Sequence, residues 1–258
     1  MLTSLFHIGF DNDRVFGAVT KRKGGVSKPP FDALNTGFQT GDLPQTIVRN
    51  RQLIFDQLPS SLHPFVFTYQ SHSTVLKKVF LKDAGKGLHS FESGVEADAL
   101  YTTDKQLPIC VFHADCVPIF LVHQSKPLIA IIHAGTPGTL QHIALKVVQS
   151  ICKQENIKPS ELDAYLGPSL DFAHHPISVE RMNGILSIDA NFAPAIKLIA
   201  GQLYVDGPLL NYMHLIDAGL SPTSIRVSTI DTFSNAKEYY SASRDVKTGR
   251  HLSFIYLK

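Results

Sequence analysis

Residues 109–143 read ICVFHADCVPIFLVHQSKPLIAIIHAGTPGTLQHI, and the rest of the chain is organised around this stretch. It contains three short apolar runs, at 109–112, 117–122 and 127–132. Each run is rich in β-branched and aromatic residues and is bounded by polar, Gly or Pro residues, which predicts three buried strands. An amphipathic helical pattern follows at 138–154, so the stretch indicates strands that are followed by a packed helix.

Polar side chains fall where these predicted strands end. Asp115 and Cys116 separate the first two runs, and His133 ends the third. Such groups are costly to bury unless they are paired or coordinated. We therefore expect Cys116 and His133 to converge on a metal ion, with His72, which lies between two further predicted strands, as the third ligand. The residues alone leave open that Cys116 is a buried thiol and that both histidines bond to strand-end amides.

The composition excludes several classes of protein. A hydrophobic content of 44% and a charged content of 18% over 258 residues indicate a soluble globular protein with a sizeable core. The net charge of +2 implies neither a nucleic-acid partner nor an anionic membrane. No apolar run reaches the roughly 18 residues of a membrane span, and the N-terminus does not resemble a secretory signal. Three cysteines, an odd count, favour a reducing, cytoplasmic compartment, with Cys110 and Cys152 expected in the core.

Strands and helices alternate irregularly along the chain, and hairpins are expected at both ends, the first over 7–20. This order predicts an α+β fold of mixed sheets flanked by helices, and no change in composition marks a linker, so we predict one domain over 1–258. Further strands are expected at 65–68, 74–80, 97–102, 162–166, 225–230 and 252–257. Further helices are expected at 44–58, capped by Asp42, and at 178–187, 193–200 and 208–218.

A basic, Gly-rich turn, KRKGG, occupies residues 21–25. Glycine amides beside an arginine suit a phosphate or carboxylate, which is one interpretation of this turn. The other is a solvated loop, and composition alone favours the loop.

Several short motifs occur in a fixed order along the chain. The central ones are Gln70-Ser71-His72, Ala97-Asp98-Ala99, Ala114-Asp115-Cys116 and His133-Ala134-Gly135. Supporting residues lie towards both ends of the chain, at Arg22, Leu34-Asn35, Asn211, Ser241, Arg244 and Thr248-Gly249-Arg250. In this order and spacing they resemble the laccase-domain family, also described as multicopper polyphenol oxidase-like proteins and as purine nucleoside phosphorylases.

The resemblance implies a four-layer α/β/β/α-like sandwich and a zinc ion held by His72, Cys116 and His133. It implies phosphorolysis of adenosine, inosine or methylthioadenosine to the base and a pentose 1-phosphate, often with adenosine deamination. A nucleoside and phosphate are then the small-molecule partners, and the chain is expected to act as a monomer or a small homo-oligomer. Three stretches depart from the family pattern, one of them Asp231-Thr232 in place of a cysteine–threonine pair. Thr136-Pro137-Gly138 stands where Trp-Arg-Gly is usual, and Ser243 stands where an arginine usually precedes Arg244.

One thiolate and two imidazoles leave zinc an open position, which is typical of a catalytic site. Zinc lowers the pKa of bound water to about 7, which suits deamination, whereas phosphorolysis needs the leaving purine stabilised and the phosphate held. The residues expected to contact phosphate are Arg22, Arg244, Arg250 and the amides near Gly138. Asn35 and Gln70 are candidates for the ribose or base. Asp115 is either a partner of a zinc-bound histidine or a turn residue.

Three rival functions remain open. A copper-dependent polyphenol oxidase is disfavoured because three ligands do not make a multicopper centre and the twelve histidines contain no His-x-His pair. A cysteine or zinc amidase would use Cys116 as nucleophile and a histidine as base on a cell-wall precursor. A binding protein without catalytic activity would explain the missing arginine.

Overall fold

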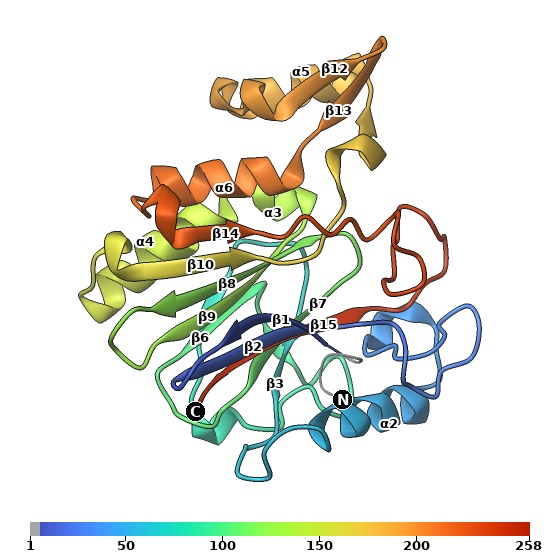
Figure 1. The fold of residues 1–258 in the computed structure, drawn as a ribbon, viewed down its shortest axis with the longest axis vertical. Coiled ribbons are helices and arrows are strands. Elements are labelled where there is room, and N and C mark those ends of the chain that lie inside the picture. The colour runs from blue at the N-terminus through green and yellow to red at the C-terminus, as the bar shows by residue number, and fades with distance from the viewer. Residues whose placement is uncertain (1–5) are drawn as a thin grey trace.

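The computed structural model describes residues 6–258, which form two six-stranded sheets packed face to face, with helices on both outer faces (Figure 1). The first sheet contains, in spatial order, β1 (Phe6–Asp11), β2 (Val15–Thr20), β15 (His251–Leu257), β7 (Ile109–His113), β3 (Val66–Tyr69) and β5 (Val95–Glu96). The second contains β14 (Ile225–Val227), β10 (Leu162–Leu166), β8 (Val117–His123), β9 (Ile129–Ala134), β6 (Ala99–Thr102) and β4 (Leu76–Lys78). Both sheets mix parallel and antiparallel pairs.

The helices lie outside the two sheets. They are α2 (Pro44–Phe55), α3 (Thr136–Leu140), α4 (Ile143–Glu155), α5 (Val179–Ile188) and α6 (Gly207–Asp217). Short 3-10 helices are η1 (Phe38–Thr40), η2 (Leu81–Asp83), η3 (Pro159–Glu161), η4 (Phe172–His174), η5 (Ala190–Ala195) and η6 (Pro222–Ser224). None of the helices in this part of the chain is long and apolar enough to span a bilayer.

The buried side chains form three layers of core between four layers of structure. One layer lies between the two sheets, one between the first sheet and α2, and one between the second sheet and α4 and α6. Strand β8 shows why the sequence folds this way: Ile119 and Leu121 pack towards the helices, whereas Phe120 and Val122 pack towards the first sheet. Because both of its faces are covered, β8 reads as a continuous apolar run. The predicted α+β sandwich of mixed sheets is confirmed.

A smaller unit stands on top of this sandwich (Figure 1). It contains α5, η5 and a three-stranded sheet of β11 (Pro176–Ile177), β13 (Gln202–Val205) and β12 (Ile196–Ile199). Its own apolar cluster includes Ile185 and Phe192 and continues into Leu140 of α3 and Leu210 of α6. The unit therefore packs on the helical layer next to α3.

Several predicted elements are wrong in detail. The helix expected over 138–154 is two helices, because His142 adopts a left-handed backbone (φ 62°) between α3 and α4. In the segment expected as a helix over 193–200, residues 193–195 end η5 and residues 196–199 are β12, the first strand of a hairpin. Ala200 (φ 49°) and Gly201 (φ 82°) make the tight turn between β12 and β13. Asp42 does not cap α2, because Leu43 occupies the N-cap position of this helix and makes no side-chain cap hydrogen bond.

The two ends of the chain meet in the first sheet. Strands β1 and β2 form the expected N-terminal hairpin, in which Phe6 pairs with Thr20. No second hairpin closes the chain, because β15 inserts between β2 and β7 and pairs antiparallel with both. The expected strands over 74–80 and 225–230 are shorter, and α2 ends at Phe55 rather than at residue 58.

The chain passes three times from the first sheet to the second at one end of the sandwich. These crossings lead from β3 to β4, from β5 to β6 and from β7 to β8, over residues 70–75, 97–98 and 114–116. Strand β9 runs antiparallel to both β6 and β8, so its last residues reach this same end. The fold therefore brings four separate segments together at one opening between the sheets.

Candidate metal centre and active site

Three side chains meet at this opening. His72 comes from the first crossing, Cys116 from the third, and His133 from the end of β9, where it pairs with Pro118 of β8. One ligand atom from each residue lies within 4.8 Å of the others, and these three are the only such group of His, Cys, Asp or Glu residues in the described chain. The predicted convergence of the three side chains is confirmed as geometry.

A buried carboxylate holds two of these residues in place. Asp98, in the second crossing, is fully buried, and its Oδ1 lies 2.9 Å from Nδ1 of His133. The same Oδ1 accepts a hydrogen bond from the backbone N–H of His72 at 3.1 Å, and Oδ2 accepts from the N–H of Ser73 at 2.7 Å. In the neutral His133 ring, donation of Nδ1–H to Asp98 leaves Nε2 without a proton and available to a metal.

Close packing and backbone conformation support this arrangement. A Cβ atom added to Gly135 would lie 2.6 Å from Cδ2 of His72 and 3.3 Å from Sγ of Cys116, so only glycine leaves room there. His72 (φ 59°) and Asp115 (φ 82°) both adopt the left-handed backbone region, which is uncommon for residues other than glycine. Such conformations gather at functional sites, where the surrounding contacts maintain them.

The electrostatics favour the ionised thiol. Burial raises the pKa of the Cys116 thiol, but His133 and His72 outweigh this effect and lower the pKa to about 6. Burial also lowers the pKa of His133, but the Cys116 sulfur and Asp98 raise it to about 9. A thiolate is the form of cysteine that binds metals, and a thiolate with two imidazoles suits zinc or copper. The three residues therefore fit a metal ion by both geometry and donor chemistry.

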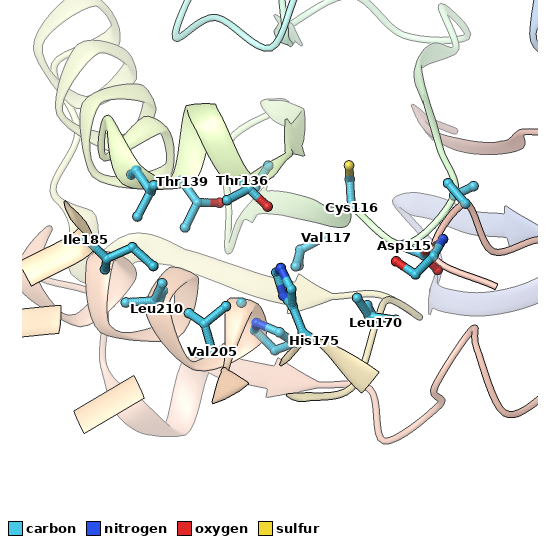
Figure 2. Close-up of a pocket in the computed structure, with 17 residues that line it drawn as sticks. Asp115, Cys116, Val117, Thr136, Thr139, Leu170, His175, Ile185, Val205 and Leu210 are labelled. Atoms are coloured by element: carbon cyan, nitrogen blue, oxygen red, sulfur yellow. Dashed lines mark hydrogen bonds between the residues drawn. The ribbon is translucent and has the colours of Figure 1, made fainter. Parts of the chain in front are cut away.

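Two cavities adjoin Cys116 on different sides. The first, here called the apolar cavity, has a volume of about 220 Å³ and lies between α3 and the appended unit. Figure 2 shows Cys116, Thr136 and Thr139 on one side of it and His175, Val205 and Leu210 on the other. Apart from His175, the appended unit contributes apolar side chains such as Ile185 to this cavity.

The second, here called the aromatic cavity, has a volume of about 230 Å³. All three of the metal-type ligands line it, together with Phe38, Phe91, Phe112, His113, Gln70 and Arg250. Ala114, Cys116 and Ala242 line both cavities and so form the ridge between them.

Of the predicted substrate residues, Gln70 and Arg250 line the aromatic cavity. The side-chain amide of Gln70 is engaged with Phe112, whose backbone N–H donates to Oε1 at 2.6 Å and whose carbonyl accepts from Nε2 at 2.8 Å. In Arg250, Nη1 donates to the carbonyls of Thr248 and Gly249, both at 3.0 Å. Its Nε and Nη2 make no hydrogen bond within residues 6–258, so they remain available to a ligand.

Asn35 and Asp115 have supporting roles. Asn35 is fully buried, and its Oδ1 accepts from the backbone N–H groups of Arg250 at 2.9 Å and Gly37 at 3.1 Å. Asp115 does not bond to either histidine of the triad, so the interpretation of it as a histidine partner is wrong; that partner is Asp98. The Asp115 carboxylate instead accepts from Thr232, Ser241 and Ser243 and anchors the C-terminal loop.

The other predicted phosphate contacts lie elsewhere or are occupied. The Arg22 guanidinium donates to Asp32 and to the Ala236 carbonyl. The Arg244 guanidinium donates to the carbonyls of Thr232, Phe233 and Tyr239. Gly138 is buried in α3, which has only five residues, and it lines neither cavity. Of these four expected contacts, the structure places only Arg250 beside the triad.

Sequence reasoning gave no role to Asp98, Phe38, Phe91 or His175. Asp98 was detectable in principle, because a lone carboxylate in the apolar run 97–102 must be paired if it is buried. The aromatic residues and His175 carry no such signal, since loops far apart in the sequence bring them to the cavities.

The sequence model of the family described as multi-copper polyphenol oxidoreductase laccase matches residues 16–258, and the chain belongs to this family.

Named relatives and solved structures agree with that assignment. Purine nucleoside phosphorylase YlmD of Bacillus subtilis is 35% identical over 252 residues, covering 96% of this chain and 90% of the relative. Purine nucleoside phosphorylase YfiH of Escherichia coli is 28% identical over 238 residues, covering 92% and 91%. The crystal structure of hypothetical protein YfiH from Bacillus licheniformis matches with a TM-score of 0.88 at 31% identity, covering 95% and 93%. YlmD from Geobacillus stearothermophilus gives a TM-score of 0.87 at 29% identity, covering 95% and 92%.

Proposed function

We propose that the protein is a zinc-dependent purine nucleoside phosphorylase that acts on adenosine, inosine or methylthioadenosine, with adenosine deamination as a second activity. One observation carries this proposal: His72, Cys116 and His133 share the aromatic cavity with Arg250. A metal-type centre and a cation for phosphate therefore lie side by side. Relatives named purine nucleoside phosphorylase support the same reaction.

In the proposed reaction the triad holds the metal, Arg250 binds phosphate, and two buried polar residues orient them. Zinc held by the triad would supply Lewis-acid polarisation and would lower the pKa of a coordinated water. Arg250 binds phosphate through Nε and Nη2, because a planar guanidinium pairs with two phosphate oxygens at once. It is the only Lys or Arg among the described residues that line either cavity. Asn35 fixes the backbone of Arg250, and Asp98 fixes His133, so both groups are oriented before substrate binds.

The direct test is incubation of zinc-loaded protein with adenosine, inosine and methylthioadenosine, with and without phosphate, followed by product masses. We expect free base and pentose 1-phosphate only when phosphate is present, and inosine from adenosine if deamination accompanies it. Release of base at the same rate without phosphate would exclude a phosphorylase.

The role of the triad is tested by Cys116→Ala. We expect loss of bound zinc and of turnover with an unchanged far-UV circular dichroism spectrum, because Cys116 lies at a cavity rather than in a core cluster. Full activity in this variant would refute the proposed centre. Covalent trapping of Cys116 by an electrophile in zinc-loaded protein would instead favour the amidase, and several coppers per chain would favour the oxidase.

We also propose that the protein works in the cytoplasm. Cys110, Cys116 and Cys152 are all free thiols, which suits a reducing compartment.

A further inference from the structure

Aromatic side chains gather at the mouth of the aromatic cavity. Phe38 and Phe91 line both this cavity and an adjoining outer hollow of about 540 Å³, to which Tyr69 also contributes. The rings of Tyr69 and Phe91 lie with their centroids 4.3 Å apart. All three side chains are only half-buried, so their rings are accessible from the cavity or the hollow. The metal-type centre therefore opens outward past a set of aromatic rings.

A buried arginine fixes the two loops that carry Phe38 and Phe91. Arg51 of α2 is 3% exposed and has no carboxylate partner among residues 6–258. Its guanidinium donates to the carbonyl of Thr36 at 2.7 and 2.9 Å, and to the carbonyls of Gly87 at 2.6 Å and Leu88 at 3.0 Å. These carbonyls lie two residues before Phe38 and three or four residues before Phe91.

Arg51 also packs directly against the aromatic side chains. Its guanidinium carbon lies 4.3 Å from the ring centroid of Phe38 and 4.8 Å from that of Phe112, which also lines the aromatic cavity. A buried charge without a counter-ion is costly, and these carbonyls and ring faces are what offset that cost. Arg51 therefore acts as a positioning residue that sets the separation of the two loops.

We infer that Phe38 and Phe91 form the platform on which the purine base stacks, with the sugar directed towards the triad. The identity of the ligand rests on the proposed nucleoside chemistry. Every purine presents an aromatic face, and a side-chain ring binds that face without regard to its exocyclic groups. The apolar cavity is lined on the side of the appended unit by aliphatic groups such as Ile185, and among the described residues its only aromatic ring is the smaller imidazole of His175.

The platform is tested with 2-aminopurine, a fluorescent purine base, titrated into the zinc-loaded full chain without phosphate. We expect Phe91→Leu to weaken binding by roughly 5- to 150-fold, since stacking on an aromatic side chain is worth ~1–3 kcal/mol per base. Phe91→Tyr should retain the affinity because it retains the ring. The matched control is Phe80→Leu, which removes a 40% exposed phenylalanine that lines neither cavity.

Steady-state kinetics of Phe91→Leu and base binding by Ile185→Ala distinguish the aromatic cavity from the apolar cavity as the site of the base. Phe91→Leu should raise the KM for nucleoside and leave the KM for phosphate and the zinc content unchanged. Base binding that is unaffected by Phe91→Leu but weakened by Ile185→Ala would overturn the inference and place the base in the apolar cavity. Absence of 2-aminopurine binding to the unaltered protein would also overturn it.

The same measurements test the aromatic platform and the phosphorylase activity independently of each other. Ring-dependent base binding without phosphorolysis would refute the phosphorylase and keep the platform. Phosphorolysis with an unchanged nucleoside KM in Phe91→Leu would keep the phosphorylase and refute the platform.

Discussion

Replacing Asp98 with asparagine tests how the centre is assembled, because it changes one oxygen to an NH₂ group at nearly constant volume. The carboxylate accepts on both sides. Oδ1 receives His133 Nδ1 and the His72 N–H, whereas Oδ2 receives the N–H groups of Ser71 and Ser73 and the Ser73 hydroxyl. An asparagine has one acceptor oxygen, so donors on one of these two sides must lose their partner.

The cost of each orientation decides the result. An NH₂ group at the Oδ2 position opposes two backbone N–H groups, those of the exposed Ser71 and the half-buried Ser73. A donor that loses its partner costs about 1–3 kcal/mol where it is shielded from water. At the Oδ1 position it opposes only one backbone N–H, because the His133 ring can change tautomer and accept at Nδ1. The second orientation is cheaper, and it moves the His133 proton to Nε2, where it blocks a metal. We therefore expect Asp98→Asn to lose about 2 kcal/mol of unfolding free energy and at least 10- to 100-fold in zinc affinity.

The assay is competition for zinc with a chromophoric chelator, together with urea unfolding with and without saturating zinc. Asp115→Asn is the matched control, because this carboxylate adjoins Cys116 in the chain but bonds to Thr232, Ser241 and Ser243. The Thr232 hydroxyl can rotate to accept from the new NH₂ group, so this variant should keep its zinc affinity. Zinc affinity equal to that of the unaltered protein in Asp98→Asn would refute the reasoning.

Three further predictions concern other parts of the molecule. Gly135→Ala should reduce zinc affinity at least about tenfold, because the added Cβ would lie 2.6 Å from Cδ2 of His72. The control is Gly184→Ala, which should keep its zinc affinity because an added Cβ there meets no described atom within 4 Å. Competition with a chromophoric chelator compares the two variants. Arg51→Met should lower the urea-derived unfolding free energy by about 3 kcal/mol, since it leaves three carbonyls unpaired; an unchanged midpoint would contradict this. His214→Phe should flatten the loss of stability on acidification. Burial and the nearby His142 lower the pKa of His214 to about 4 in the folded protein. Between about pH 6.5 and pH 4 the unfolded chain therefore binds a proton at His214 that the folded protein does not bind. This difference lowers the free energy of unfolding by up to ~1.4 kcal/mol for each pH unit of acidification. Urea unfolding at pH 7 and pH 5 measures the slope, and equal slopes in both proteins would count against this account.

The sequence predicts the central strands well because their burial is local information. Strands β7, β8 and β9 are buried along their whole length, so a continuous apolar run identifies each of them without knowledge of its partners. The polar residues that interrupt these runs mark the end of the sandwich where the chain changes sheet. The ligand triad is predictable for the same reason, since Cys116 and His133 stand at such interruptions.

Helix boundaries in this protein depend on single backbone conformations that composition does not reveal. His142 continues an amphipathic pattern, yet its left-handed backbone divides α3 from α4. Ile196 and Ile199 fit a helix or a strand equally well, and the turn at Ala200 and Gly201 selects the hairpin. The ring of His142 packs against Phe192 of the appended unit, a contact that lies outside any local window of sequence.

The arginines show why residue type alone does not locate a phosphate site. Arg22, Arg244 and Arg250 have the same chemistry and all follow or precede Gly-rich or polar loops. Two of them spend their donors on backbone carbonyls, because irregular loops leave carbonyls unpaired and a guanidinium with five N–H groups can satisfy several at once. Arg250 differs because β15 begins at His251, so the strand fixes its backbone at the opening between the sheets. Gly37 packs against its stem, where an added Cβ would lie 2.7 Å from Cγ, and Nε and Nη2 have no hydrogen-bond partner within residues 6–258. Its position at the start of a strand in the first sheet, rather than its charge, is what makes Arg250 the phosphate-binding residue in the proposed reaction.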